Sequence, residues 1–166
     1  DKIKIDSTRA IIDVNWPCNV EYLYNDTNLG CQKAVSNAIT WALTKEEKML
    51  ILEDDTLPSI SFFKFCETLL HKYERNKNIM SITGVSWQHQ FLPRKYSYYF
   101  SCYPGIWGWA TWKDRWIEYY EAKQNKNPKD IISTIANFSD SEKEIDFHYR
   151  NISTSLSRKL DSWGFL

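Results

Sequence analysis

The chain has 166 residues, an aromatic content of 16% and equal numbers of acidic and basic side chains, 21 of each. A chain of this length can bury a sizeable core, so we expect a single domain over residues 1–166. The balanced charge argues against nucleic acid or an anionic membrane surface as the main partner. No signal peptide and no apolar run near 20 residues is visible, which excludes an integral membrane segment on sequence grounds and predicts a cytoplasmic protein.

The apolar patterning predicts strands and helices that alternate along the chain. In chain order we expect a helix over 7–14, a strand over 19–24, a helix over 31–43, a buried strand over 49–52, a helix over 62–73, a strand over 79–85, an aromatic strand-like segment over 96–102, and helices over 113–123, 130–138 and 141–160. The early order strand, helix, strand favours a right-handed parallel crossover and therefore an α/β sheet.

The four cysteines are widely spaced, and no two of them form a C-x-x-C pair. This spacing predicts neither a zinc site nor a dense disulfide framework, and it fits a reducing compartment. Cys66 falls in an apolar helical pattern, where a free cysteine is most simply a small buried hydrophobe.

Three adjacent acidic residues, Glu53, Asp54 and Asp55, follow directly on the buried strand. Their negative charges repel one another, so holding them together favours a hard divalent cation with phosphate oxygens behind it. In open α/β sheets, ligands bind where the carboxyl ends of the strands lie, and these acids are placed there. The alternative is a strand that runs into a solvated acidic turn, which is common in proteins.

A second informative stretch runs from Pro104 to Trp112 and combines glycines with tryptophans. Gly105 and Gly108 permit backbone shapes that other residues resist, while Trp107 and Trp109 supply large flat faces. Such a loop can line a pocket. The alternative is a tryptophan-rich corner of the core.

Three stretches, taken together and in order, resemble the GT-A glycosyltransferases, specifically the inverting group like N-acetylglucosaminyltransferase I and its bacterial relatives. They are Asn28-Leu29-Gly30, then Ile51-Leu52-Glu53-Asp54-Asp55 followed by Ser61-Phe62-Phe63, and then Pro104-Gly105-Ile106-Trp107-Gly108-Trp109. The resemblance covers about residues 6–163. It implies an α/β fold of the GT-A (Rossmann-like) type, an open and mostly parallel sheet flanked by helices. The family's first strand would precede Asp1, so we expect an internal fragment of a longer enzyme that lacks this strand.

The resemblance also implies roles for individual residues. Asp55 matches the position that ligates Mn²⁺ (or Mg²⁺), which bridges the diphosphate of a nucleotide-sugar donor. Asp54 matches the position near the ribose, and Glu53 the position near the donor sugar. Asp161, which precedes Ser162-Trp163, resembles the catalytic base, and the stretch Trp107-Gly108-Trp109 would shape the pocket for the donor sugar and the glycan acceptor.

The function expected from the resemblance is an inverting, metal-dependent transfer of a sugar to an acceptor hydroxyl in glycan or surface polysaccharide synthesis. A metal held by a carboxylate neutralises the departing diphosphate, and a second carboxylate removes the proton of the attacking hydroxyl. Two alternatives stay open. One is a sugar-1-phosphate nucleotidyltransferase, and the other is a non-catalytic carbohydrate-binding or interaction domain derived from the same fold.

Overall fold

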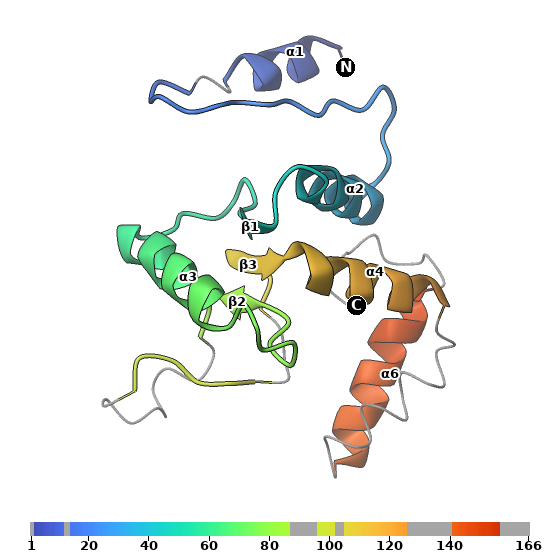
Figure 1. The fold of residues 1–166 in the computed structure, drawn as a ribbon. Coiled ribbons are helices and arrows are strands. Elements are labelled where there is room, and N and C mark those ends of the chain that lie inside the picture. Colours follow the sequence, from blue (N-terminus) through green and yellow to red (C-terminus); the bar gives the residue numbers. More distant parts are fainter. Residues whose placement is uncertain (1, 12–13, 87–95, 102–104, 126–140, 157–166) are drawn as a thin grey trace.

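The computed structural model describes residues 2–11, 14–86, 96–101, 105–125 and 141–156 (Figure 1). Side chains are described as far as residue 120 in the fourth of these ranges and residue 150 in the last. The elements within these ranges are the helices α1 (Lys2–Ala10), α2 (Cys31–Leu43), α3 (Ile60–Lys72), α4 (Lys113–Asn125) and α6 (Glu142–Leu156), and the strands β1 (Lys48–Ile51), β2 (Ile82–Thr83) and β3 (Trp109–Trp112).

The three described strands form one sheet in the order β1-β3-β2. β3 lies in the middle and is antiparallel to both neighbours, with Ile51 opposite Trp109 and Ile82 opposite Ala110. The expectation of an open, mostly parallel GT-A (Rossmann-like) sheet is therefore wrong. β1 and β2 do run in the same direction, but they do not pair with each other, because β3 separates them.

Two departures from the predicted elements explain this correction. The stretch around Trp109 was expected to be a loop, yet it supplies the central strand. The expected strand over 19–24 is not a strand, and its side chains are exposed. Without that strand, the parallel crossover through α2 does not form.

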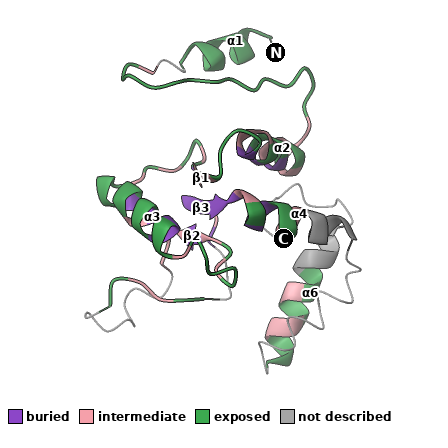
Figure 2. Cartoon of the chain, viewed as in Figure 1, coloured by how far each residue is buried: buried purple, intermediate pink, exposed green. Residues whose placement is uncertain are grey.

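All four residues of β3 are buried, as expected for a strand that is covered on both faces. Successive side chains of a strand point to opposite faces. Ala110 and Trp112 therefore join a core beneath α3, while Trp109 joins a second core beneath α2 and α4. The result is a helix–sheet–helix sandwich in which the buried residues gather around β3 (Figures 1 and 2).

The predicted helices on either side of β1 are confirmed. α2 matches its predicted bounds and places Ile39 and Leu43, one turn apart, in the core. α3 begins two residues before its predicted start and buries Phe62, Cys66 and Leu69 along one stripe. The predicted helices over 113–123 and 141–160 correspond to α4 and α6.

Other predicted elements differ from the structure. The strand expected over 79–85 is reduced to the two residues of β2, and the described part of the segment expected over 96–102 contains no strand. The helix predicted over 130–138 lies outside the described residues. A helix was predicted over 7–14, but the first helix of the structure, α1, begins and ends earlier, at Lys2 and Ala10. None of its residues is buried. Its Arg9 guanidinium lies 4.2 Å from the centre of the Tyr24 ring.

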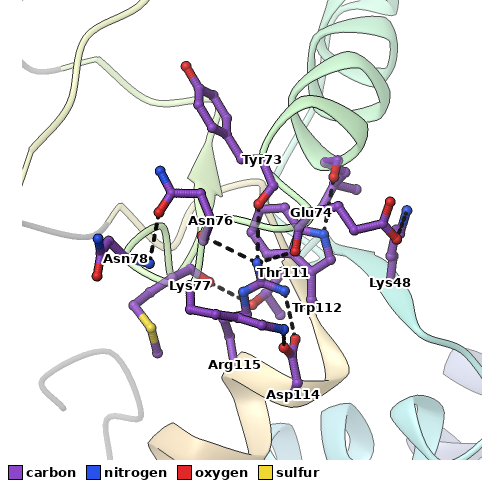
Figure 3. A network of polar contacts seen from close by, with 12 residues as sticks. Lys48, Tyr73, Glu74, Asn76, Lys77, Asn78, Thr111, Trp112, Asp114 and Arg115 are labelled. Carbon is purple, nitrogen blue, oxygen red and sulfur yellow. Dashed lines mark hydrogen bonds and ion pairs between the residues drawn. The ribbon is translucent and has the colours of Figure 1, made fainter.

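Arg115, in the first turn of α4, ties that helix to the end of α3 (Figure 3). Its side chain is only 2% exposed. Nη2 donates hydrogen bonds to three backbone oxygens that follow α3, those of Tyr73, Glu74 and Asn76, at 3.1, 2.6 and 3.3 Å. A cation is favoured there, because the carbonyl groups at a helix C-terminus carry partial negative charge. Burial lowers the pKa of Arg115, but the neighbouring acids Glu74 and Glu118 oppose that effect.

Arg115 also contacts a side chain of its own helix, Asp114, and one of β3, Trp112. Nη1 of Arg115 donates to Asp114 at 2.8 Å, and the guanidinium lies 4.2 Å from the centre of the Trp112 ring. Trp112 in turn donates from Nε1 to the Leu70 carbonyl at 3.1 Å. These contacts fix the angle at which β3 and α4 meet α3.

Within the described ranges, no helix has both the length and the apolar character needed to cross a membrane.

Cys66 provides a direct test of the core beneath α3. Its side chain is 0% exposed, and burial raises the pKa of its thiol to about 11, whereas Cys18 and Cys31 are exposed. Because the thiolate is the reactive form, we expect Ellman's reagent at pH 8 to modify Cys18 and Cys31 in the native protein and Cys66 only after unfolding in guanidinium. Peptide mass spectrometry assigns the modified cysteines. Native-state modification of Cys66 at the rate of Cys18 would contradict the packing described here.

Candidate functional site

The antiparallel pairing of β1 with β3 brings together the two stretches that the sequence singled out. The carboxyl end of β1 leads into the acidic residues, and the start of β3 follows the glycine–tryptophan loop. Since Ile51 lies opposite Trp109, residues 52–56 and 105–108 lie at the same edge of the sheet. We call this edge, comprising residues 52–56, 83–84 and 105–108, the acidic edge.

Glycines allow close contact at the acidic edge. A Cβ carbon placed on Gly108 would lie 3.5 Å from Cγ2 of Thr56 and 3.6 Å from Cδ2 of Leu52. Gly84, which follows β2, donates its backbone N–H to the Gly108 carbonyl at 2.8 Å. A Cβ on Gly105 would lie 2.6 Å from Oγ1 of Thr83, closer than real Cβ atoms come to other atoms. The segments that follow β1 and β2 thus meet the segment that precedes β3.

The acids themselves form a tight turn, in which the Thr56 N–H donates to the Glu53 carbonyl at 3.0 Å. Asp54 and Asp55 are exposed at its tip, while Glu53 is half-buried. One carboxylate oxygen of Glu53, Oε1, is buried and has no hydrogen-bond partner among the described residues. Burial raises the pKa of Glu53, and the charges of Asp55 and then Asp54 raise it further. A buried acceptor without a partner is costly, which makes it a position where a ligand hydroxyl or a cation would be favoured.

The fit of a divalent cation can be judged from the ligands present. In the part of the chain that the structure describes, no three His, Cys, Asp or Glu side chains converge as a metal site would require. The described residues alone therefore make no such cage. A divalent cation could instead be held by Asp55 if oxygens of a bound diphosphate supplied the other ligands. Such an arrangement is common for Mg²⁺ with phosphate substrates.

The residues of the glycine–tryptophan loop have different environments. Trp107 is 51% exposed and lies at the acidic edge. Gly108 is buried, with φ of +71°, between Leu52, Thr56 and Phe62. Trp109 is buried in the core beside Trp116, with ring centres 6.4 Å apart. Asp161 lies outside the described residues.

The first stretch of the resemblance, Asn28-Leu29-Gly30, forms the entry to α2. The Asn28 Oδ1 accepts the Gly30 N–H at 2.9 Å, and Gly30 has φ of +75°. These features turn the chain into the helix, which is a structural role that the sequence pattern explains.

Sequence reasoning missed two residues at the acidic edge. Thr56 has a buried hydroxyl oxygen without a hydrogen-bond partner among the described residues, and Gly84 packs against the Phe62 ring while it binds Gly108. The position of Thr56, directly after the acids, was the available signal. For Gly84, the available signal in the sequence was its position as a glycine near the end of a predicted strand.

Gly108→Ala should destabilise the protein through its backbone rather than by a clash. The Cβ would meet only ordinary van der Waals contacts, but φ of +71° is unfavourable for alanine by roughly 1–2 kcal/mol. Denaturant unfolding should therefore show a loss of about 1 kcal/mol in the free energy of unfolding. No loss, or a gain, would contradict the left-handed conformation at this position.

No family model, no curated protein and no solved structure gives a significant match to this chain.

Proposed function

We propose that the chain is the catalytic part of a glycosyltransferase that moves a sugar from a nucleotide-sugar donor to a glycan hydroxyl, with the acidic edge as its donor site. The observation that carries this proposal is the pairing of Ile51 with Trp109, which joins the acidic turn to the glycine–tryptophan loop at one edge. Support comes from the residues at this edge and not from the type of sheet.

The residues of the acidic edge have the properties that such a donor site needs. Asp55, exposed at the tip of the turn, would hold Mn²⁺ or Mg²⁺ together with the diphosphate oxygens of the donor. The cation would supply charge neutralisation of the leaving diphosphate. Asp54, beside it, is exposed and able to accept hydrogen bonds from the ribose hydroxyls.

Glu53 and Trp107 would orient the sugar. The buried Oε1 of Glu53 lacks a partner within the described ranges, and a sugar hydroxyl donated to it would satisfy it. The exposed face of Trp107 provides an apolar surface for the C–H face of a pyranose ring. Asp161 remains our candidate for the base that takes the acceptor proton, on the resemblance alone.

A calorimetric titration tests this proposal directly. UDP-, GDP- and dTDP-sugars are titrated into the protein with Mn²⁺ and again with EDTA. We expect one of them to bind in Mn²⁺ and to lose affinity by at least about tenfold in EDTA, since the diphosphate would lose its bridging cation. Binding of a free oligosaccharide without any nucleotide-sugar binding would instead favour the non-catalytic carbohydrate-binding domain, to which the exposed Trp107 is also suited.

A further inference from the structure

A second cluster of reactive groups lies at the far end of α3 from the acidic edge. The last turn of α3 ends with Lys72, and Tyr73 follows it as the helix cap. Tyr98, from the segment 96–101, crosses this end of the helix. Its phenolic oxygen lies 2.6 Å from Nζ of Lys72 and 2.7 Å from the hydroxyl of Tyr73.

The direction of these hydrogen bonds follows from the chemistry of the groups. The ammonium of Lys72 can only donate, so the oxygen of Tyr98 accepts from it. The bond with Tyr73 also stabilises negative charge on Tyr98, because the pKa of Tyr98 is lowered by Lys72 first and Tyr73 second. Either hydroxyl can donate in the bond between Tyr73 and Tyr98, and that bond raises the pKa of Tyr73 while it lowers that of Tyr98. When Tyr73 donates, two donors converge on the Tyr98 oxygen and favour its phenolate form.

Aromatic side chains hold the ring of Tyr98 in place. Phe65, Tyr73 and Phe100 each meet it edge to face, with ring centres 6.4, 6.3 and 5.9 Å away. Edge-to-face contacts of this kind are favourable and fix the ring orientation. Lys72 is exposed and Tyr98 is partly exposed, so a small reagent in solvent can reach the pair.

We propose that Tyr98 is a nucleophilic tyrosine, a site at which the chain accepts the acyl group of an activated acyl donor on its phenolic oxygen. The oxygen attacks the acyl carbon and forms an ester bond, while the bond between that carbon and the leaving group breaks. The phenol proton ends on the leaving group, so no oxidant or further reactant is needed. The neighbouring Lys72 does not compete, because its hydrogen bond to Tyr98 raises its pKa and keeps its amine protonated.

N-acetylimidazole is a suitable probe, since it carries an activated acetyl group and releases imidazole. Tyr22 is the matched control, because its side chain is 49% exposed and no described residue hydrogen-bonds its hydroxyl. We expect Tyr98 to be acetylated faster than Tyr22 by about threefold or more. Charge-assisted hydrogen bonds favour the reactive phenolate of Tyr98, and solvent screening keeps this effect modest. Peptide mass spectrometry locates the acetyl groups, and hydroxylamine removes those on tyrosine but not those on lysine.

Two variants separate the contributions to this reactivity. Lys72→Met should bring the acetylation rate of Tyr98 to within about twofold of that of Tyr22, because the charged donor is gone. Tyr73→Phe should have a smaller effect in the same direction. Circular dichroism checks that the variants fold.

The wild type provides a readout that needs no variant. Among the described residues, Lys72 and Tyr73 are the charged and titratable groups that face the Tyr98 oxygen, so its acetylation rate should level off at a lower pH than is usual for a phenol. Equal rates for the two tyrosines, an unchanged rate in a folded Lys72→Met protein, or acetylation of Lys72 before Tyr98 would each overturn the proposal.

Discussion

Asp55→Asn is expected to weaken the binding of the nucleotide-sugar donor in Mn²⁺ by at least about tenfold. Mutating a group that only orients a metal ligand already lowers metal affinity by about tenfold or more, and losing the ligand itself should lower it at least as much. The substitution keeps the size of the side chain and its place at the exposed tip of the turn, but removes the charge that would hold the cation. In EDTA the variant and the wild type should bind donor equally weakly. Isothermal titration calorimetry with and without Mn²⁺ measures both effects.

Glu46→Gln is the matched control for this experiment. Glu46 is an exposed carboxylate that lies just before β1, whereas Asp55 lies just after it. The two substitutions change the net charge equally, so a general electrostatic effect on an anionic donor would appear in both. A donor affinity that rises or stays unchanged in Asp55→Asn would remove the acidic edge as the site of the cation.

Arg115→Met is expected to lower the free energy of unfolding by about 3 kcal/mol, because it leaves buried groups without their charged partner. The carbonyls of Tyr73, Glu74 and Asn76 would lose a donor, and the Trp112 ring would lose the cation that lies over it. Methionine fills much of the same space, so the loss would reflect polar contacts more than a cavity. Guanidinium unfolding followed by far-UV circular dichroism measures it.

Arg150→Met serves as the comparison for Arg115. Arg150 is also helical and also paired with an aspartate, Asp146, one turn away, but its side chain is 75% exposed. Exposed ion pairs contribute little, so this variant should unfold close to the wild type. Equal losses in the two variants would mean that the bonds to the end of α3 do not stabilise the fold.

The helices could be predicted from the sequence because their apolar residues recur at helical spacing and their ends carry clear signals. Gly30 before α2 and Ser59 before α3 are examples of such end signals. The strand with acids at its end could also be predicted from its run of apolar residues. Its burial was predicted wrongly, because only Ile51 of β1 is buried and Leu52, outside the strand, is exposed.

The sheet could not be predicted, because its pairing depends on contacts between residues far apart in the sequence. The stretch Trp109–Trp112 directly follows a glycine, Gly108, and has no alternating pattern, so nothing local identified it as the central strand. Conversely, residues 19–24 alternate as a strand does but find no strand partner in the described structure. Local pattern gives the propensity of a segment, while the partner decides whether a strand forms.

The sequence predicted which residues belong to the acidic edge but not how the strands bring them there. Glu53, Asp54, Asp55, Trp107 and Gly108 were all selected from the sequence. Their placement at the same edge depends on the antiparallel pairing of β1 with β3, which the sequence analysis did not foresee. The environment of Trp109 was equally out of reach, because only the packing of α4 on the sheet decides whether that ring faces solvent or Trp116.

The position of β3 in the sheet has a consequence for the order in which the chain can fold. β3 is the last of the three strands in sequence, yet it is the strand to which both others are hydrogen-bonded. During synthesis, β1 and β2 therefore leave the ribosome before β3, their partner in the described sheet, exists. Both strands keep unpaired edges until Trp112 has been synthesised. Closing the long loops that connect them to β3 costs entropy before the pairing can form. This interval is when the nascent chain is most exposed to aggregation and most dependent on α3 to shield its apolar face.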